Sequence, residues 1–236
     1  MYMKKHAALI VIACVLVSGA LYASVFRTTQ PTRKASTTPS NMVGTPAPSE
    51  AAGSTTELLI GKATAPITII EYGDYKCPKC NELHQKAGKD IRRDWVDTGK
   101  AKIIYRPYPL FGEDSGLALY ASYCAAEQGK FSAYHDKMFN YMWINFLSRG
   151  DTDATVRTLF SPEKLGQLAG EAGLDAEQFT TCAGGRTHAT AYNTAVDKAA
   201  GDSVQGTPTL IIGGQKVVGP QPYNVYKALL EIQQRS

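Results

Sequence analysis

Short apolar runs alternate with longer stretches of helical periodicity over residues 58–236. Residues 67–72 form a β-branched run bounded by a proline and a glycine, which predicts a buried strand. Residues 77–97 have a helical composition, and residues 101–106 form a second apolar run that ends at a proline. Strand, helix and strand in this order predict a βαβ unit and therefore an α/β fold.

The middle of the chain carries only helical patterns, which predicts one long helical insertion over about residues 113–200. The predicted helices of this insertion cover residues 117–128, 131–147, 161–172, 176–182 and 187–200. Beyond it, residues 209–212 and 216–218 flank a pair of glycines, which predicts a hairpin. Residues 223–233 then predict a closing helix.

Residues 1–26 have the organisation of an export signal. Residues 7–26 carry no charge and follow Lys4 and Lys5, as expected when the chain start stays in the cytoplasm. The segment is long enough for a membrane anchor, which needs about 20 apolar residues, and the small residues up to Ala20 also suit signal-peptide cleavage. Signal peptide and membrane anchor are both open, and either predicts a periplasmic or other extracytoplasmic location.

The next segment, residues 27–57, is dominated by Thr, Ser, Pro, Ala and Gly and predicts a disordered linker. The rest of the chain has enough apolar residues for a core, since 44% of the sequence is hydrophobic. The net charge of +4 comes from scattered Lys and Arg, and no run is dense enough to follow a phosphate backbone. Nucleic acid is therefore not an expected partner.

The strongest chemical signal is the sequence Cys77-Pro78-Lys79-Cys80, which follows a predicted strand and begins a predicted helix. A thiolate at a helix N-terminus meets unpaired backbone N–H groups and the positive end of the helix dipole, so Cys77 is expected to be acidic and nucleophilic. Cys80 lies one turn further along the same face and can attack a mixed disulfide at Cys77. This predicts a redox-active pair that needs no other cofactor.

A CxxC sequence is also common in structural disulfides and as half of a zinc site. Zinc needs two further ligands in a suitable spacing. The remaining candidates show no second CxxC or HxxxH pair; they are His84, His135, His188, Cys124 and Cys182. In an oxidising compartment the four cysteines after residue 57 allow up to two disulfides, and no metal site is predicted.

The sequence from Glu71 to Cys80, EYGDYKCPKC, together with GTPT at residues 206–209, resembles the DsbA-like branch of the thioredoxin superfamily. The helical insertion and its segment YCAAEQGKF at residues 123–131 are similar to that branch as well. The resemblance covers nearly all of residues 58–236. It implies a thioredoxin fold with an inserted helical subdomain, and a thiol:disulfide oxidoreductase that introduces disulfide bonds into exported proteins.

The resemblance also implies roles for residues outside the CxxC sequence. The peptide between Thr207 and Pro208 is expected to be cis and to face the cysteines, where its backbone pairs with an extended substrate. Glu71 is expected to move protons to and from Cys80, the alternative being an edge position with access to solvent. Lys79 departs from the histidine or tyrosine of better-known members, which leaves the redox potential open.

A second, structural disulfide between Cys124 and Cys182 is implied in the same way, the alternative being two unpaired buried thiols. The implied partners are cysteine-containing exported proteins as substrates and a DsbB-like membrane protein as electron acceptor, with the chain acting as a monomer. Two rival functions stay open. One is a disulfide isomerase or reductase, and the other is a non-catalytic metal-handling or adaptor protein.

Overall fold

The computed structural model describes residues 57–236. The expected signal or anchor in residues 1–26 and the expected linker, apart from Glu57, lie outside the described residues. Among residues 57–236, no helix combines the length and the apolar character needed to cross a membrane.

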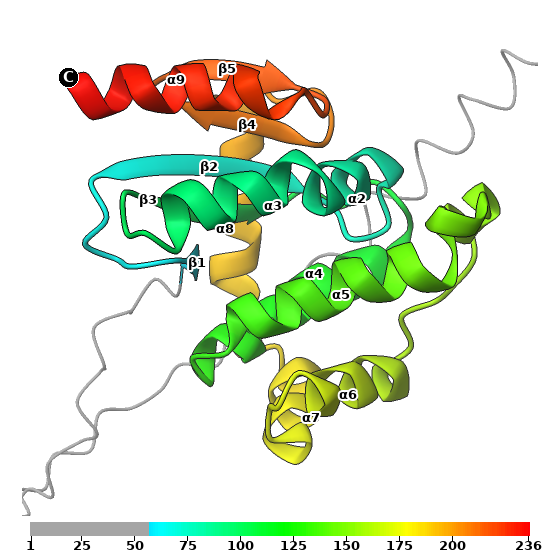
Figure 1. Cartoon of the computed structure of the whole chain (residues 1–236). Helices are drawn as coiled ribbons and strands as arrows, with labels where there is room; N and C mark the ends of the chain where they lie inside the picture. The colour runs from blue at the N-terminus through cyan, green and yellow to red at the C-terminus, as the bar shows by residue number, and fades with distance from the viewer. Residues whose placement is uncertain (1–56) are drawn as a thin grey trace, which may run out of the picture. The chain divides into compact units, whose positions relative to one another are not determined.

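One mixed sheet organises the described residues, with the strand order β1-β3-β2-β4-β5 (Figure 1). Its strands are β1 (Leu58–Ile60), β2 (Ile67–Gly73), β3 (Ala101–Pro107), β4 (Thr209–Ile212) and β5 (Gln215–Val218). β2 and β3 are parallel, as a βαβ unit requires, and the other pairs are antiparallel. The two predicted strands and the hairpin are confirmed, whereas β1 was not predicted because three residues are too few to show a pattern.

The helix that follows β2 is interrupted. The sequence predicted one helix over residues 77–97, and the structure has three consecutive segments there: α2 (Pro78–Gln85), α3 (Ala87–Ile91) and the π-helix η1 (Arg92–Val96). The break lies at Lys86, whose φ of −110° and ψ of −106° are not helical. The closing helix α9 (Tyr223–Arg235) packs against α3 and against β2 and β4.

The insertion is helical, as predicted. It contains α4 (Glu113–Glu127), α5 (Phe131–Asn145), the 3₁₀ turns η2 (Leu147–Arg149) and η3 (Thr152–Thr155), α6 (Pro162–Glu171), α7 (Ala176–Gly185) and α8 (Ala189–Gly201). α4 and α5 contact β1, and α6 and α7 pack against them further from the sheet. α8 lies on the other side of the sheet and contacts β3, so the end of the insertion returns to the sheet (Figure 1).

The alternation of side chains along β2 explains why both faces of the sheet are covered. Ile67 and Ile69 belong to the larger core cluster with α2, α4, α5 and α9. Ile70 and Tyr72 contact the smaller cluster on the α8 side, around Ala199. Each fully buried Ile contributes about 1.5–3 kcal/mol, so a strand apolar on both faces is stable only between two layers of helix.

Candidate active site

Cys77 occupies the N-cap position of α2, and Pro78 is the first helical residue. The short turn after β2 ends here, with the Cys77 N–H donating to the Asp74 carbonyl at 3.1 Å. The Cys80 N–H donates to Cys77 Sγ at 3.4 Å. The sulfur thus takes the place of the side-chain oxygen of a usual N-cap residue such as Ser or Asp. Cys77 is 4% exposed and Cys80 is fully buried. Cys77 is thus the more accessible of the two, although far less exposed than a solvent-facing residue.

The turn that carries Cys77 is fixed by a buried carboxylate. Asp74 accepts hydrogen bonds from the Lys76 N–H at 2.8 Å, the Leu110 N–H at 2.8 Å and the Ser115 hydroxyl at 2.6 Å. The partners come from the turn itself, from the loop after β3 and from α4, so one side chain joins three segments. A charge buried to this degree is tolerable only with such partners.

The two thiols differ strongly in acidity. Hydrogen bonding from Cys80 lowers the pKa of Cys77 to about 7, against the opposing effect of burial. Burial, followed by the interaction with Cys77, raises the pKa of Cys80 well above its ordinary value. The pair therefore loses its first proton near neutral pH, and the resulting thiolate resides on Cys77, the residue expected to be the nucleophile.

The loop before β4 faces the two cysteines. The peptide bond between Thr207 and Pro208 is cis, as the resemblance implied. The Thr207 carbonyl accepts a hydrogen bond from the Cys77 thiol at 3.4 Å. Thr207 Oγ1 is buried without a partner among the described residues. The loop and the CxxC sequence thus form one site.

Glu71 lies in the middle of the sheet, since β2 runs between β3 and β4 with Glu71 opposite Tyr105 and Leu210. The alternative of an edge position is therefore wrong. Burial raises the pKa of Glu71 to about 7, and Arg92 opposes this rise. The residue lines a cavity of about 20 Å³, which is room for about one water molecule. No hydrogen bond joins Glu71 to Cys80 in the described structure, so a proton exchanged between them has to pass through an intermediary.

His84, which was not assigned to the site from the sequence, lines the same cavity as Glu71, together with Arg92 and His135. Burial lowers the pKa of His84 to about 4, so its imidazole is neutral at pH 7. Its Nε2 atom lies 3.6 Å from a carboxylate oxygen of Asp136, which is partly exposed. One signal in the sequence could have identified His84. It follows Cys77 by seven residues, about two helical turns, so both side chains lie on the same face of α2.

A dithiol at the start of a helix, on a thioredoxin fold and beneath a cis-proline loop, defines a thiol:disulfide oxidoreductase of the DsbA-like kind. The family model described as Thioredoxin matches residues 53–232, and the chain belongs to this family. It is similar to disulfide bond formation protein D of Bacillus subtilis, with 27% identity over 181 residues that cover 73% of this chain and 75% of that protein.

Solved structures show the same fold. Oxidised BdbD from Bacillus subtilis superposes with a TM-score of 0.66 and 24% identity, covering 77% of this chain and 95% of BdbD. Alpha-DsbA1 from Wolbachia pipientis superposes with a TM-score of 0.58 and 20% identity, covering 76% and 91% of the two chains. These likenesses support the assigned fold class, an α/β thioredoxin fold with an inserted helical subdomain.

Proposed function

We propose that this oxidoreductase introduces disulfide bonds into exported proteins through the CPKC centre. The observation that carries the proposal is the separation of the two acidities: Cys77 has a pKa of about 7, whereas the pKa of buried Cys80 is well above its ordinary value. A protein that stabilises a thiolate on its reduced form makes the corresponding disulfide a better oxidant. It also makes Cys77 the better leaving group when substrate is released.

The reaction starts from the Cys77–Cys80 disulfide. A substrate thiolate attacks Cys77 Sγ, and the Cys77–Cys80 bond breaks with its electron pair on Cys80, which takes up a proton. A second substrate thiolate then attacks the substrate sulfur of the mixed disulfide, and Cys77 leaves as a thiolate. The substrate has lost two electrons, and the protein dithiol has gained them. A membrane partner of the DsbB kind is proposed to accept these electrons and restore the disulfide.

Glu71 is proposed to hold the proton that Cys80 takes up and later returns. Its pKa of about 7 means that both protonation states are populated at neutral pH, as a general acid and base requires. The cavity that it lines with His84 has room for about one water, which can exchange a proton with the carboxyl group; neither cysteine lines this cavity. The loop of Thr207 and Pro208 is proposed to hold the substrate chain, because it lies against the Cys77 sulfur.

The separation of the two acidities supports the oxidase, whereas the absolute value of the Cys77 pKa favours the rival function of a reductase. A nucleophile with a pKa near 7 lies at the level of thioredoxin, a reductant, and well above the pKa of about 3.5 in DsbA. A reductase of the cytoplasm is disfavoured if the protein is extracytoplasmic. That location is inferred from residues 1–26. The Cys124–Cys182 disulfide supports it, because such bonds persist in oxidising compartments.

The deciding experiment is the reduction potential of the Cys77/Cys80 couple, measured by equilibration with glutathione buffers, alongside oxidation of a reduced, unfolded substrate protein. A potential of about −120 mV with rapid substrate oxidation supports the oxidase. A potential of about −270 mV, with reduction of substrate disulfides instead, supports the reductase and overturns the proposed direction of electron flow. Cys77→Ser serves as the inactive control in both assays.

A further inference from the structure

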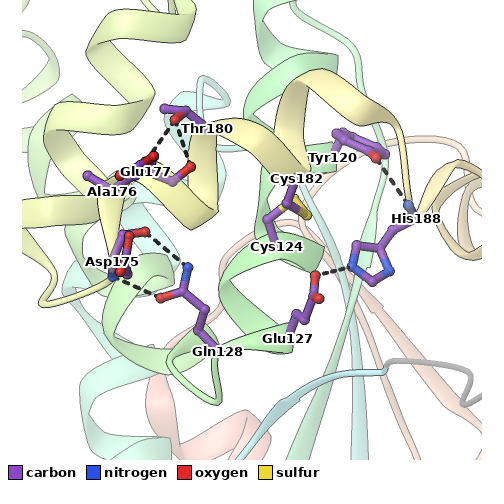
Figure 2. Close-up of a disulfide and its surroundings, with 10 residues drawn as sticks. All are labelled: Tyr120, Cys124, Glu127, Gln128, Asp175, Ala176, Glu177, Thr180, Cys182 and His188. Atoms are coloured by element: carbon purple, nitrogen blue, oxygen red, sulfur yellow. Dashed lines mark hydrogen bonds and ion pairs between the residues drawn. A yellow bond between two sulfur atoms is a disulfide. The ribbon is translucent and has the colours of Figure 1, made fainter.

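A second group of potential ligand atoms lies beside the structural disulfide, away from the CPKC centre. A carboxylate oxygen of Glu127, the sulfur of Cys182 and a ring nitrogen of His188 all lie within 4.8 Å of one another. Figure 2 shows that the Glu127 carboxylate and the His188 ring face each other next to the sulfurs of Cys124 and Cys182. None of these residues takes part in the proposed redox reaction.

His188 is held in place by contacts with α4. Its Nε2 atom lies 2.9 Å from Glu127 Oε2, and its backbone N–H donates to the Tyr120 hydroxyl at 3.1 Å. Its ring also stacks on Tyr123, with the ring centres 6.1 Å apart. Tyr120, Tyr123 and Glu127 lie three and four residues apart on one face of α4. They hold the imidazole against α4, which also carries Cys124.

We propose that reduction of the Cys124–Cys182 disulfide turns this place into a Zn²⁺ site. Its ligands are Cys124 Sγ, Cys182 Sγ, His188 Nε2 and Glu127 Oε2. Two thiolates, one imidazole and one carboxylate are all ligand types that Zn²⁺ accepts in tetrahedral sites. The disulfide and the metal are therefore alternative occupants of the same cysteines.

The distances suit this chemistry. Tetrahedral bonds of about 2.0–2.3 Å place the ligand atoms about 3.3–3.8 Å apart. Three of the four atoms are already within 4.8 Å of one another, so small side-chain movements suffice. The Cα atoms of Cys124 and Cys182 are 5.8 Å apart, which lets both sulfurs reach a common ion without movement of the backbone of α4 or α7.

The redox step is a thiol–disulfide exchange with an external dithiol. The dithiol gives two electrons to the Cys124–Cys182 bond and becomes a disulfide itself, while the two cysteines become thiols. Zn²⁺ then displaces one proton from each thiol as it binds. In the reduced chain the ion joins α4, α7 and the start of α8, the elements that the disulfide and the Glu127–His188 pair otherwise connect.

The test uses the full-length chain with every other cysteine removed, so that the CPKC thiols do not bind metal. The three background substitutions are Cys14→Ser, Cys77→Ser and Cys80→Ser. Co²⁺ reports thiolate coordination by its absorption spectrum, and Zn²⁺ affinity follows from competition with a chromophoric chelator. We expect the reduced chain to bind one ion with thiolate-to-Co²⁺ charge transfer, and the oxidised chain to bind Zn²⁺ at least about 100-fold more weakly, because a disulfide supplies no thiolate.

Two substitutions test the non-cysteine ligands. His188→Ala and Glu127→Gln should each weaken Zn²⁺ binding by about tenfold or more. Substitutions of residues that only support metal ligands already cost this much, so the loss of a ligand should cost at least as much. Glu177→Gln removes an exposed carboxylate from the helix of Cys182, and His84→Ala removes a histidine outside the cluster; both should leave the affinity unchanged. Glu127 is 46% exposed, so its replacement keeps the test valid if His188→Ala does not fold.

Three results would overturn the proposal. One is a reduced chain that does not bind Zn²⁺. Another is equal affinity in the oxidised and reduced forms. The third is full affinity in Glu127→Gln and in folded His188→Ala, which would show that two thiols alone chelate the ion. Because the CPKC cysteines are absent, none of these results depends on the proposed oxidoreductase function.

Discussion

The ammonium group of Lys76 lies 2.7 Å from a carboxylate oxygen of Asp114, and both side chains are more than nine-tenths buried. Lys76 precedes the nucleophilic cysteine, and Asp114 lies in the first turn of α4. The ammonium group also donates to the Arg157 carbonyl at 2.9 Å, while Asp114 accepts from the Leu159 N–H at 2.7 Å. The ion pair thus connects the CPKC turn with two segments of the inserted subdomain.

Removing one partner of this pair should be strongly destabilising. Lys76→Met leaves the Asp114 carboxylate buried without its cation, and we expect a loss of about 3–5 kcal/mol in the free energy of unfolding. The combined Lys76→Met/Asp114→Leu variant should recover part of the loss, because no unpaired charge stays buried. Urea denaturation of the three proteins provides the measurement. A loss below about 1 kcal/mol for Lys76→Met, the level of a surface pair, would contradict the prediction.

The lowered pKa of Cys77 is predicted to depend on the side chain of Cys80. Cys80→Ala removes the hydrogen-bond donor that is the largest cause of the shift, so the pKa of Cys77 should rise from about 7 toward its ordinary value. Cys80→Ser keeps a hydroxyl donor and should retain a lower pKa than Cys80→Ala. The rate of alkylation by iodoacetamide as a function of pH reports the thiolate. Midpoints that stay at the wild-type value in both variants would mean that the helix N-terminus, not the Cys80 side chain, sets the acidity.

The sequence predicted those features that depend on local pattern. The β-branched run around Ile69 predicted a strand, and the position of Cys77 at a helix start follows from the order of strand, CPKC and helix. The Lys76–Asp114 pair could not be predicted, because the partners are 38 residues apart and each alone resembles a surface charge. The position of His84 in the cavity beside Glu71 could not be predicted for a related reason, since the cavity exists only once α2, α3, α5 and the sheet have packed.

The disulfide between Cys124 and Cys182 is predicted to stabilise the fold without taking part in turnover. It joins residues separated by 58 positions, and closing a loop of this length restricts the unfolded chain by about 4 kcal/mol in the entropy model. Cys124→Ala/Cys182→Ala should therefore lower the melting temperature and leave the rate of substrate oxidation by Cys77 and Cys80 unchanged. Loss of oxidation in a variant that is still folded at the assay temperature would contradict a purely structural role.

Glu71→Gln is predicted to change both the stability of the protein and its pH dependence. The pKa of Glu71 is raised from 4.5 to about 7 in the folded state, so the folded protein binds more protons than the unfolded chain between these values. Stability therefore falls as the pH rises through this window, by about 3 kcal/mol once Glu71 is ionised. A glutamine does not ionise, and it escapes this loss.

We therefore expect Glu71→Gln to gain about 3 kcal/mol relative to the wild type between pH 4 and pH 8. The titrations of His84 and His135 are common to both proteins and cancel in the difference. Denaturation of both proteins at several pH values measures this difference, and a difference independent of pH would mean that Glu71 titrates normally. At neutral pH the variant should also turn over more slowly, by about 10²–10⁴-fold if Glu71 is the proton store for Cys80. Unchanged turnover with a pH-dependent gain in stability would assign Glu71 a buried position and no part in proton transfer.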